Sequence, residues 1–237
     1  MTQLCFIKWP ELKKGLLIKR YKRFLADIRT ENGDIITAHC PNSGSMTGCS
    51  TPGNHVYYSE SDNPRRKLKY TWELIEMPDS MVGINTLVPN RLVRQCVQHG
   101  AVEELAGYDS VKAEVRAGAH TRFDLMLKGE EYRPCYVEIK NCTLVENGIG
   151  LFPDAKTKRG KNHLEELQRQ VRLGHRCIMF YLIQRMDAGS FMPAHNIDPE
   201  YGKELRKASE NGVEILVYDT QIDTQGIKLG RSLPWSL

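Results

Sequence analysis

Two short polar motifs in the second half of the chain carry residue types suited to phosphate chemistry. Asp124 lies in a strand-like run over 122–127, and Glu138 lies in the next run, over 135–139, which Lys140 follows. Side chains alternate along a strand, so Glu138 and Lys140 project from one face and Ile139 from the other. If the two strands pair through a turn near Gly129, Asp124 can reach Glu138. The spacing therefore predicts a catalytic group of Asp124, Glu138 and Lys140.

Two carboxylates and one ammonium suit a hard divalent cation such as Mg²⁺ or Mn²⁺. Asp124 and Glu138 would share the ion, and Lys140 would orient or help to deprotonate the attacking water. Such an arrangement fits phosphodiester hydrolysis, in which a metal offsets the charge that develops on the phosphate. The alternative, from spacing alone, is an ion-paired strand end on a solvated sheet edge.

The elements that must position these residues follow the order helix, three strands, helix, strand. Apolar spacing predicts helices over 89–100, 161–173 and 199–211, and strands over 111–116, 122–127, 135–139, 176–183 and 213–219. Helices that flank a mixed sheet indicate an α/β domain, which we place at residues 83–237.

The first part of the chain is rich in short strands and contains no helical pattern. Runs over 15–30 and 34–40 meet at Asn32-Gly33, a tight hairpin turn, and further strands are expected over 55–59, 68–77 and 81–85. Five short strands fit a small OB-type barrel, which we place at residues 1–82; such barrels commonly hold nucleic acid or sugars. Tyr70 and Trp72 are expected in its core, with a stacking platform as the alternative.

Basic residues are clustered although the net charge is only +4. Three basic segments, within 8–29, 65–69 and 156–176, indicate a polyanionic partner. Tyr21 could stack on an unpaired base while its basic neighbours neutralise phosphates. The alternative is an exposed strand face. The predicted nucleic-acid-binding residues in the first domain are Lys19, Arg20, Tyr21, Lys22, Arg23, Arg65, Arg66 and Lys67.

Other classes of function have no motif in this sequence. There is no GxxxxGK[ST] loop, no strand followed by GxGxxG and no GxSxG elbow, which argues against nucleotide-driven, dinucleotide and serine-hydrolase chemistry. The longest run without polar residues, 177–183, is far shorter than the roughly 20 residues that span a bilayer. We expect a cytoplasmic protein without a membrane partner.

Segments spread over residues 16 to 164 resemble the sugar fermentation stimulation protein A family. The Asp124 and Glu138-Ile139-Lys140 pair, within its element order, also resembles the PD-(D/E)xK motif of restriction-endonuclease-like nucleases, although Phe123 stands where that motif has Pro. The family-like segments are Lys19–Leu25, His39–Asn42, Gly44, Met46–Gly48, Thr71–Glu73, Asn85–Leu87, Asn90–Leu92, Phe152–Ala155, Arg159-Gly160 and His163-Leu164. The resemblance implies an OB-like domain, a nuclease-like domain, and bacterial DNA binding without marked sequence preference. It also implies a regulatory link to maltose metabolism.

The nuclease resemblance adds candidate residues. Its motif falls on Asp124, Glu138 and Lys140, with Glu104 or Glu114 as an extra metal-binding carboxylate. Arg159 and His163 stand at the start of the next helix, where basic side chains and free backbone N–H groups could receive a phosphate.

Three hypotheses follow. The first is a largely sequence-non-specific DNA-binding protein that keeps a divalent-metal site. The second is an active Mg²⁺- or Mn²⁺-dependent nuclease that cleaves DNA or RNA. The third is a regulator that binds a sugar or a protein on the barrel face. The sequence leaves the oligomeric state open.

Overall fold

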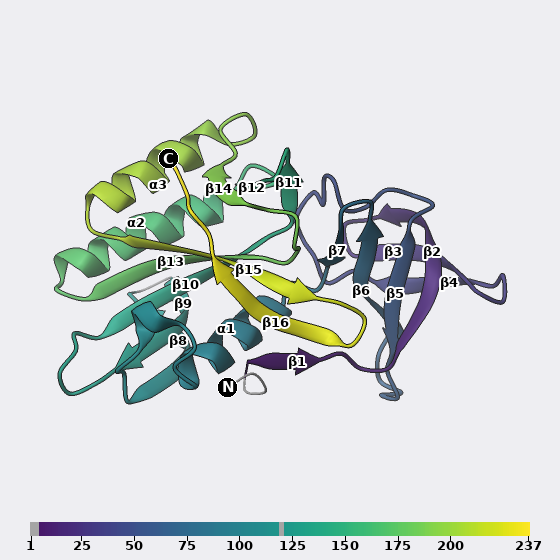
Figure 1. The fold of residues 1–237 in the computed structure, drawn as a ribbon, viewed down its shortest axis with the longest axis horizontal. Helices are drawn as coiled ribbons and strands as arrows, with labels where there is room; N and C mark the ends of the chain where they lie inside the picture. The colour runs from purple at the N-terminus through teal and green to yellow at the C-terminus, as the bar shows by residue number, and fades with distance from the viewer. Residues whose placement is uncertain (1–4, 119–120) are drawn as a thin grey trace.

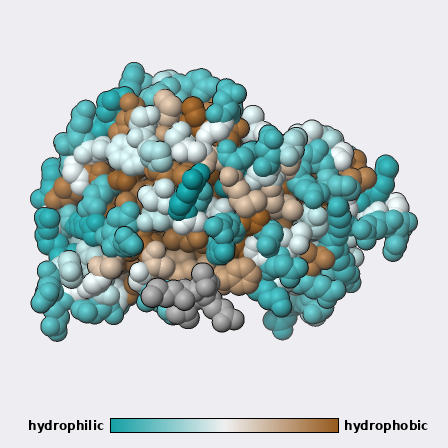
Figure 2. All heavy atoms as spheres, viewed as in Figure 1, coloured by the Kyte–Doolittle hydropathy of each residue, from teal (hydrophilic) through white to brown (hydrophobic). Residues whose placement is uncertain are grey.

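Two β-rich parts lie side by side in the computed structural model, which describes residues 5–118 and 121–237 (Figure 1). One part is a barrel, and the other is a seven-stranded sheet with helices on both faces. Hydrophilic residues cover much of the outer edge of both parts (Figure 2). No helix in the described ranges is long and apolar enough to cross a membrane.

The barrel is closed by five strands, and a sixth strand extends its sheet. The strand order is β4-β3-β2-β5-β6-β7, and parallel pairing of Ala38 with Tyr70 and of His39 with Thr71 joins β4 to β6. This confirms the predicted OB-like barrel. Its strands are β2 (Leu12–Tyr21), β3 (Leu25–Thr30), β4 (Ile35–His39), β5 (His55–Glu60), β6 (Tyr70–Met77) and β7 (Ser80–Gly83).

The barrel interior is filled by alternate residues of these strands, as a half-buried sheet requires. Leu17, Ile28, Val56 and Trp72 are buried there, and the Trp72 indole N–H donates to the carbonyl of Leu74 at 2.8 Å. Tyr70 is half-buried and packs edge-on against Tyr58. The core assignment of Trp72 is therefore confirmed.

The predicted long strand over 15–30 is in fact two strands. The chain turns at Lys22 and Arg23, whose φ angles are 46° and 66°, and β2 then pairs with β3. Lysine and arginine seldom adopt a positive φ, so no Gly or Asn signals this turn in the sequence. The Asn32-Gly33 turn between β3 and β4 lies where predicted, with Gly33 at φ 90°.

The second part is built on a mixed sheet ordered β1-β16-β15-β13-β10-β9-β8. Its centre is β13, which is almost wholly buried and pairs in parallel with β10 and β15. The antiparallel strands β8 and β9 form one edge. The strands are β1 (Phe6–Lys8), β8 (Ser110–Ala117), β9 (Thr121–Lys128), β10 (Cys135–Cys142), β13 (Arg176–Ile183), β15 (Glu214–Ile222) and β16 (Gly226–Ser232).

Helices cover both faces of this sheet (Figure 1). On one face, helix α1 (Val88–Gln98) buries Leu92, Val93 and Cys96 against inward residues of β9, β10 and β13, and the short 3-10 helix η1 (Glu103–Leu105) follows it. On the other face, α2 (Lys158–Arg172) and α3 (Pro199–Glu210) form a second core. The predicted α/β domain with a mixed sheet is confirmed.

The first strand belongs to the second part of the molecule, although residues 1–82 were expected to form the barrel domain. Phe6, Ile7 and Lys8 pair with β16, and Ile7 and Trp9 are buried in the core beneath α1. A three-residue strand carries too little pattern to show from sequence which sheet it joins. The predicted start of the second domain at residue 83 coincides with the last residue of β7.

A small third sheet lies beside the junction of the two parts. It consists of β11 (Leu144–Glu146), β12 (Ile149–Phe152) and β14 (Ser190–Pro193), none of which was predicted. The segment after β12 leads to α2 and contacts the barrel: the Met46 N–H donates to Asp154 Oδ2 at 2.8 Å, and the Ser45 hydroxyl donates to the Asp154 carbonyl. The segment between β12 and α2 thus helps to fix the barrel against the α/β part.

Candidate active site

Asp124 and Glu138 come together where β9 and β10 separate. The antiparallel register between these strands runs from Cys135–Leu127 to Val137–Leu125. Beyond it, Asp124 Oδ2 accepts the backbone N–H of Ile139 at 2.7 Å. The Asp124 side chain thus takes a backbone donor that a longer ladder would have used, so the strands part and both carboxyl groups lie at the opening.

Helix α1 holds the second oxygen of Asp124. The Asn90 amide donates to Oδ1 at 2.6 Å. Asn90 was not predicted as a site residue, since a single polar position in an amphipathic helix has no distinguishing spacing. With both oxygens occupied, the orientation of the Asp124 side chain is fixed by β10 on one side and by α1 on the other.

Glu138 is the most deeply buried residue of the site, with 3% of its surface exposed. Its Oε1 accepts from the Lys140 ammonium at 2.6 Å and also contacts His163 Nδ1. Its Oε2 has no hydrogen-bond partner among the described residues. A buried carboxylate oxygen without a partner is costly, so this atom marks the place where a ligand would be stabilised.

The two carboxyl groups have pKa values that are shifted in opposite directions. Burial, and after it the charge of Glu138, raises the pKa of Asp124 to about 7. Burial alone would also raise the pKa of Glu138, but the Lys140 ammonium and His163 outweigh it and hold that pKa below its usual value. Two neighbouring carboxyls with divergent pKa values are typical of functional sites.

His163 and Arg159 approach the site from the first turns of α2. The Arg159 Nε–H donates to His163 Nε2 at 3.3 Å. Arginine can only donate, so Nε2 accepts, and in a neutral imidazole the proton is on Nδ1, from which it donates to Glu138. His163 is buried, with 6% of its surface exposed, and contacts Glu138, whereas the sequence suggested direct phosphate binding. Arg159 is exposed.

The residues present fit a hard divalent cation. Mg²⁺ is commonly held by one or two carboxylates, with waters and substrate phosphate completing its shell. Asp124 and the unpartnered Glu138 Oε2 would supply the protein ligands. In residues 5–118 and 121–237, no group of three or more His, Cys, Asp or Glu has metal-centre geometry, so protein ligands alone would leave open positions.

The two candidates for a third carboxylate have other partners. Glu104 accepts the Tyr218 hydroxyl at 2.7 Å, on the α1 side of β15. Glu114 lies on β8 between Ala113, which pairs with Leu125, and Val115, which pairs with Phe123. Its side chain is exposed, and its carboxylate lies 3.7 Å from the Arg122 guanidinium. The structure therefore does not place either carboxylate in the buried cluster.

The predicted basic segment of the barrel has two structural roles. Lys19 lies 5.1 Å from the centre of the Tyr21 ring, and the Tyr21 hydroxyl donates to Asp27 at 3.0 Å. The Arg20 guanidinium donates to the carbonyls of Asn42, Gly44 and Ser45 at 2.8 to 3.1 Å. Arg20 therefore shapes the loop after β4, which faces the second part of the molecule.

The remaining basic residues gather at one end of the barrel. Leu25 pairs with His39, and His39 pairs with Thr71, so the turn at Lys22 and Arg23 and the loop before β6 emerge together. Arg66 anchors that loop by donating to the Thr71 hydroxyl at 2.8 Å. We call this region the basic end of the barrel; its residues, all exposed, are Lys22, Arg23, Arg65, Arg66 and Lys67.

Replacing Arg20 with Lys is expected to destabilise the protein by about 1 to 3 kcal/mol, because an ammonium cannot donate to three carbonyls in the fork geometry of a guanidinium. Thermal unfolding should show a fall of about 2 to 12 °C. Arg29→Lys, on an exposed position of β3, is the matched control. An unchanged midpoint for Arg20→Lys would contradict the structural role.

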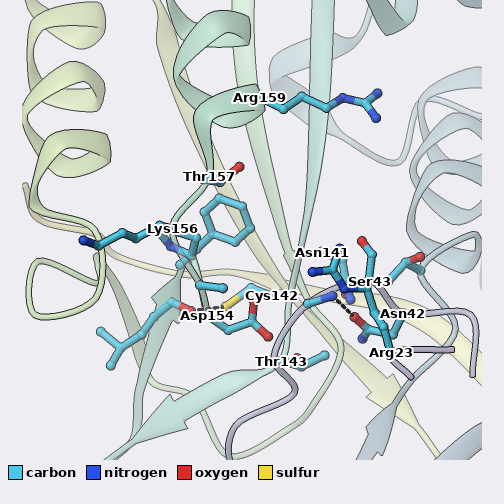
Figure 3. A pocket seen from close by; sticks show the side chains of 16 residues that line it. Arg23, Asn42, Ser43, Asn141, Cys142, Thr143, Asp154, Lys156, Thr157 and Arg159 are labelled. Atoms are coloured by element: carbon cyan, nitrogen blue, oxygen red, sulfur yellow. Dashed lines mark hydrogen bonds between the residues drawn. The ribbon is translucent and has the colours of Figure 1, made fainter. Parts of the chain in front are cut away.

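A cavity of about 400 Å³ lies between the barrel and the α/β part (Figure 3). We call it the junction cavity. Its walls come from the β2–β3 turn, the loop after β4, the end of β10 and the segment that leads into α2. The lining residues are Arg23, Asn42, Ser43, Gly44, Thr86, Asn141, Cys142, Thr143, Leu151, Phe152, Pro153, Asp154, Ala155, Lys156, Thr157 and Arg159.

An OB barrel followed by an α/β domain with a mixed sheet and flanking helices defines the class of this protein. Residues 18–84 match the family model described as the SfsA N-terminal OB domain, and residues 87–226 match the sugar fermentation stimulation protein RE domain. The chain belongs to the sugar fermentation stimulation protein (SfsA) family, as the sequence resemblance predicted.

Curated relatives and a solved structure agree with this assignment. A sugar fermentation stimulation protein homolog from Geotalea daltonii is 52% identical over 226 residues, covering 95% of this chain and 97% of the relative. The homolog from Geobacter sulfurreducens is 51% identical, covering 94% and 95%. The structure of Pyrococcus furiosus SfsA in complex with Ca²⁺ has a TM-score of 0.89 at 23% identity, covering 98% of both chains, and shows the same fold.

Proposed function

We propose that this protein binds DNA, with little sequence preference, through the basic end of the barrel, and holds a divalent cation at Asp124 and Glu138. The observation that carries the proposal is a buried Glu138 oxygen that has no hydrogen-bond partner in the described part of the chain and lies beside a second carboxylate. The related Pyrococcus furiosus protein is described in complex with Ca²⁺, another hard cation that prefers oxygen ligands. We propose Mg²⁺ or Mn²⁺ as the ion here, and RNA as a further ligand to be tested.

The basic end suits phosphate contacts more than base recognition. Arg65 and Lys67 are exposed on the loop before β6, and Lys22 and Arg23 are exposed on the turn between β2 and β3. Contacts of this kind position a polynucleotide without reading its sequence. Each phosphate neutralised releases counterions, so affinity should fall with salt.

DNA affinity is expected to fall on a log–log plot against salt with a slope of about −3 to −4, corresponding to about four phosphate contacts. The double variant Arg65→Ala/Lys67→Ala should reduce the steepness of that slope by about 2 and weaken different sequences alike. Filter binding or fluorescence anisotropy at salt concentrations from about 50 to about 200 mM measures the DNA affinity and its slope. Lys203→Ala on α3 is the control, and an affinity indifferent to salt would rule out the proposed interface.

The arrangement around Glu138 favours a second candidate function, hydrolysis of a phosphodiester at the same site. A bound divalent cation would offset negative charge on the phosphate. Lys140 keeps Glu138 ionised and oriented, since its ammonium is only 2.6 Å from Oε1. His163 holds the same oxygen from α2, and Arg159 reaches solvent at the mouth of the site. The direct test is metal-dependent cleavage by wild-type and Glu138→Gln protein.

The regulatory link to maltose metabolism and the sugar- or protein-binding alternative stay predictions from the sequence. A sugar would need a polar concave surface, and the junction cavity is concave and polar. Its arginines suit an anionic ligand better than a neutral sugar.

A further inference from the structure

The junction cavity combines groups from both parts of the molecule that recognise phosphate. Arg23 comes from the barrel, and Arg159 comes from α2. In Figure 3 Arg159 lies at the top of the view, apart from the other lining side chains, Arg23 lies at the lower right beside Asn42 and Ser43, and Lys156 extends to the left. Arginine presents a planar fork that matches phosphate oxygens in bidentate fashion. The side chains of Ser43, Thr86 and Thr157 add hydroxyl groups to the same lining.

The charges of the lining favour an anion. Among the described lining residues, three are basic (Arg23, Lys156 and Arg159) and one is acidic, Asp154, whose Oδ2 already accepts the Met46 N–H. The first turn of α2 contains no acidic residue and carries Lys158 and Arg159. Basic side chains at a helix N-terminus are unfavourable beside the helix dipole, and a bound anion would offset this.

One wall of the cavity is built from contacts between the two parts. The loop after β4 is bonded to Asp154 through Ser45 and Met46. Gly44 packs so closely against Asp154 that an added Cβ would be 2.6 Å from Oδ2. A polynucleotide strand that enters the cavity would therefore be blocked at this wall. The volume of about 400 Å³ is that of a small-ligand site and is far too small for a duplex.

The cavity adjoins the candidate active site. Glu138, Lys140 and Cys142 follow one another on the same face of β10, and Cys142 lines the cavity. Arg159 both lines the cavity and contacts His163. Cys142 lies four positions after Glu138 along the strand, which corresponds to about 13 Å. A phosphate in the cavity would therefore lie within about one or two nucleotides of the buried carboxylates.

We propose that the junction cavity binds a terminal phosphate monoester. On a polynucleotide this ligand would be the phosphate at a strand end. Its binding would place a nearby phosphodiester at Asp124 and Glu138. That placement rests on the proposed function, whereas phosphate binding in the cavity does not. A free mononucleotide presents the same chemistry and is the second source to be distinguished.

The test compares two single-stranded oligonucleotides of one sequence, with a terminal phosphate or a terminal hydroxyl, and a mononucleotide. Binding is measured in EDTA by anisotropy, with competition for the unlabelled mononucleotide, so that no cleavage occurs. Wild-type protein is expected to prefer a phosphate at the 5′ or the 3′ end by about tenfold over the matching hydroxyl. Arg23→Asn should reduce the preference to below about twofold, because one charged hydrogen-bond donor is lost.

Lys22→Asn is the matched control. Lys22 and Arg23 are adjacent, both exposed and both at positive φ, which Asn tolerates, but only Arg23 lines the cavity. Lys22→Asn should weaken all oligonucleotides through lost charge and leave the phosphate preference intact. The mononucleotide could also compete with the oligonucleotides for wild-type protein and fail to compete for Arg23→Asn. This result would support phosphate binding in the cavity and would identify the free mononucleotide as the ligand.

Equal affinity for phosphate and hydroxyl ends, without mononucleotide competition, would overturn the proposal. So would an equal loss of preference in Lys22→Asn and Arg23→Asn. Failure of the proposed function would give a different result from failure of the cavity proposal. It would appear as absent metal binding or as salt-independent affinity for the hydroxyl-ended oligonucleotide.

Discussion

Replacing Glu138 with Gln is expected to abolish divalent-cation binding and to lower any metal-dependent cleavage of DNA or RNA by about 100- to 1,000-fold. The substitution keeps the shape of the side chain and removes the charge that a hard cation requires. At about 100 times the dissociation constant, Mn²⁺ should stabilise wild-type protein by about 2.7 kcal/mol. For a chain of this size that corresponds to a rise of roughly 5 to 10 °C in the unfolding midpoint. Glu138→Gln should show a rise below about 1 °C.

Three further Gln variants control for this result. Glu200→Gln removes an exposed carboxylate on α3 and should keep the full Mn²⁺ effect. Glu104→Gln and Glu114→Gln should keep it as well, because these carboxylates contact Tyr218 and Arg122. A full Mn²⁺ effect in Glu138→Gln would show that the ion binds elsewhere, and cleavage that persists in this variant would exclude Glu138 as a catalytic residue.

Asp124→Asn is expected to stabilise the metal-free protein at pH 8. The pKa of Asp124 is raised from 3.8 to about 7, first by burial and then by Glu138. Below pH 3.8 the carboxyl is protonated in both folded and unfolded chains and does not affect stability. Between pH 3.8 and about 7 only the unfolded chain is ionised, so stability falls as pH rises, and above pH 7 the penalty is complete. The gain from Asp124→Asn should therefore increase between pH 5 and pH 8 by about 2 kcal/mol.

The hydrogen bonds of Asp124 can survive this substitution. An Asn oxygen can still accept from Ile139, and a flipped Asn90 amide can accept from the new amide group. Glu138→Gln should act in the opposite direction and destabilise the protein by about 1 to 3 kcal/mol at pH 8, because Lys140 loses its ion-pair partner. Urea unfolding in EDTA at the two pH values measures both changes. Destabilisation by Asp124→Asn at pH 8 would contradict the raised pKa of Asp124.

The sequence predicts the parts of this fold that have a strong local pattern. The amphipathic spacing of Leu92, Val93 and Cys96 predicted α1, and the apolar run within 176–183 predicted the strand that proves to be the buried β13. The alternation in Glu138-Ile139-Lys140 placed Glu138 and Lys140 on one face, where an ion pair of 2.6 Å joins them. These features depend on neighbouring residues alone.

Features that depend on distant contacts were not visible in the sequence. Asn90 orients Asp124 across 34 positions; the spacing in α1 does not distinguish it from other polar residues, and only its place in a family-like segment singled it out. Arg20 was predicted to contact a polyanion, whereas its guanidinium binds three carbonyls that only the folded barrel brings near. The junction cavity forms where the barrel meets the segment before α2, so neither part alone indicates it.

Anomalous diffraction from crystals soaked in Mn²⁺ would test most directly whether Asp124 and Glu138 hold a metal ion. We expect a peak within coordination distance of Glu138 Oε2 and of one Asp124 oxygen, with waters completing the shell. A strong peak elsewhere on the protein, or none between these two carboxylates at saturating Mn²⁺, would contradict the proposed metal site.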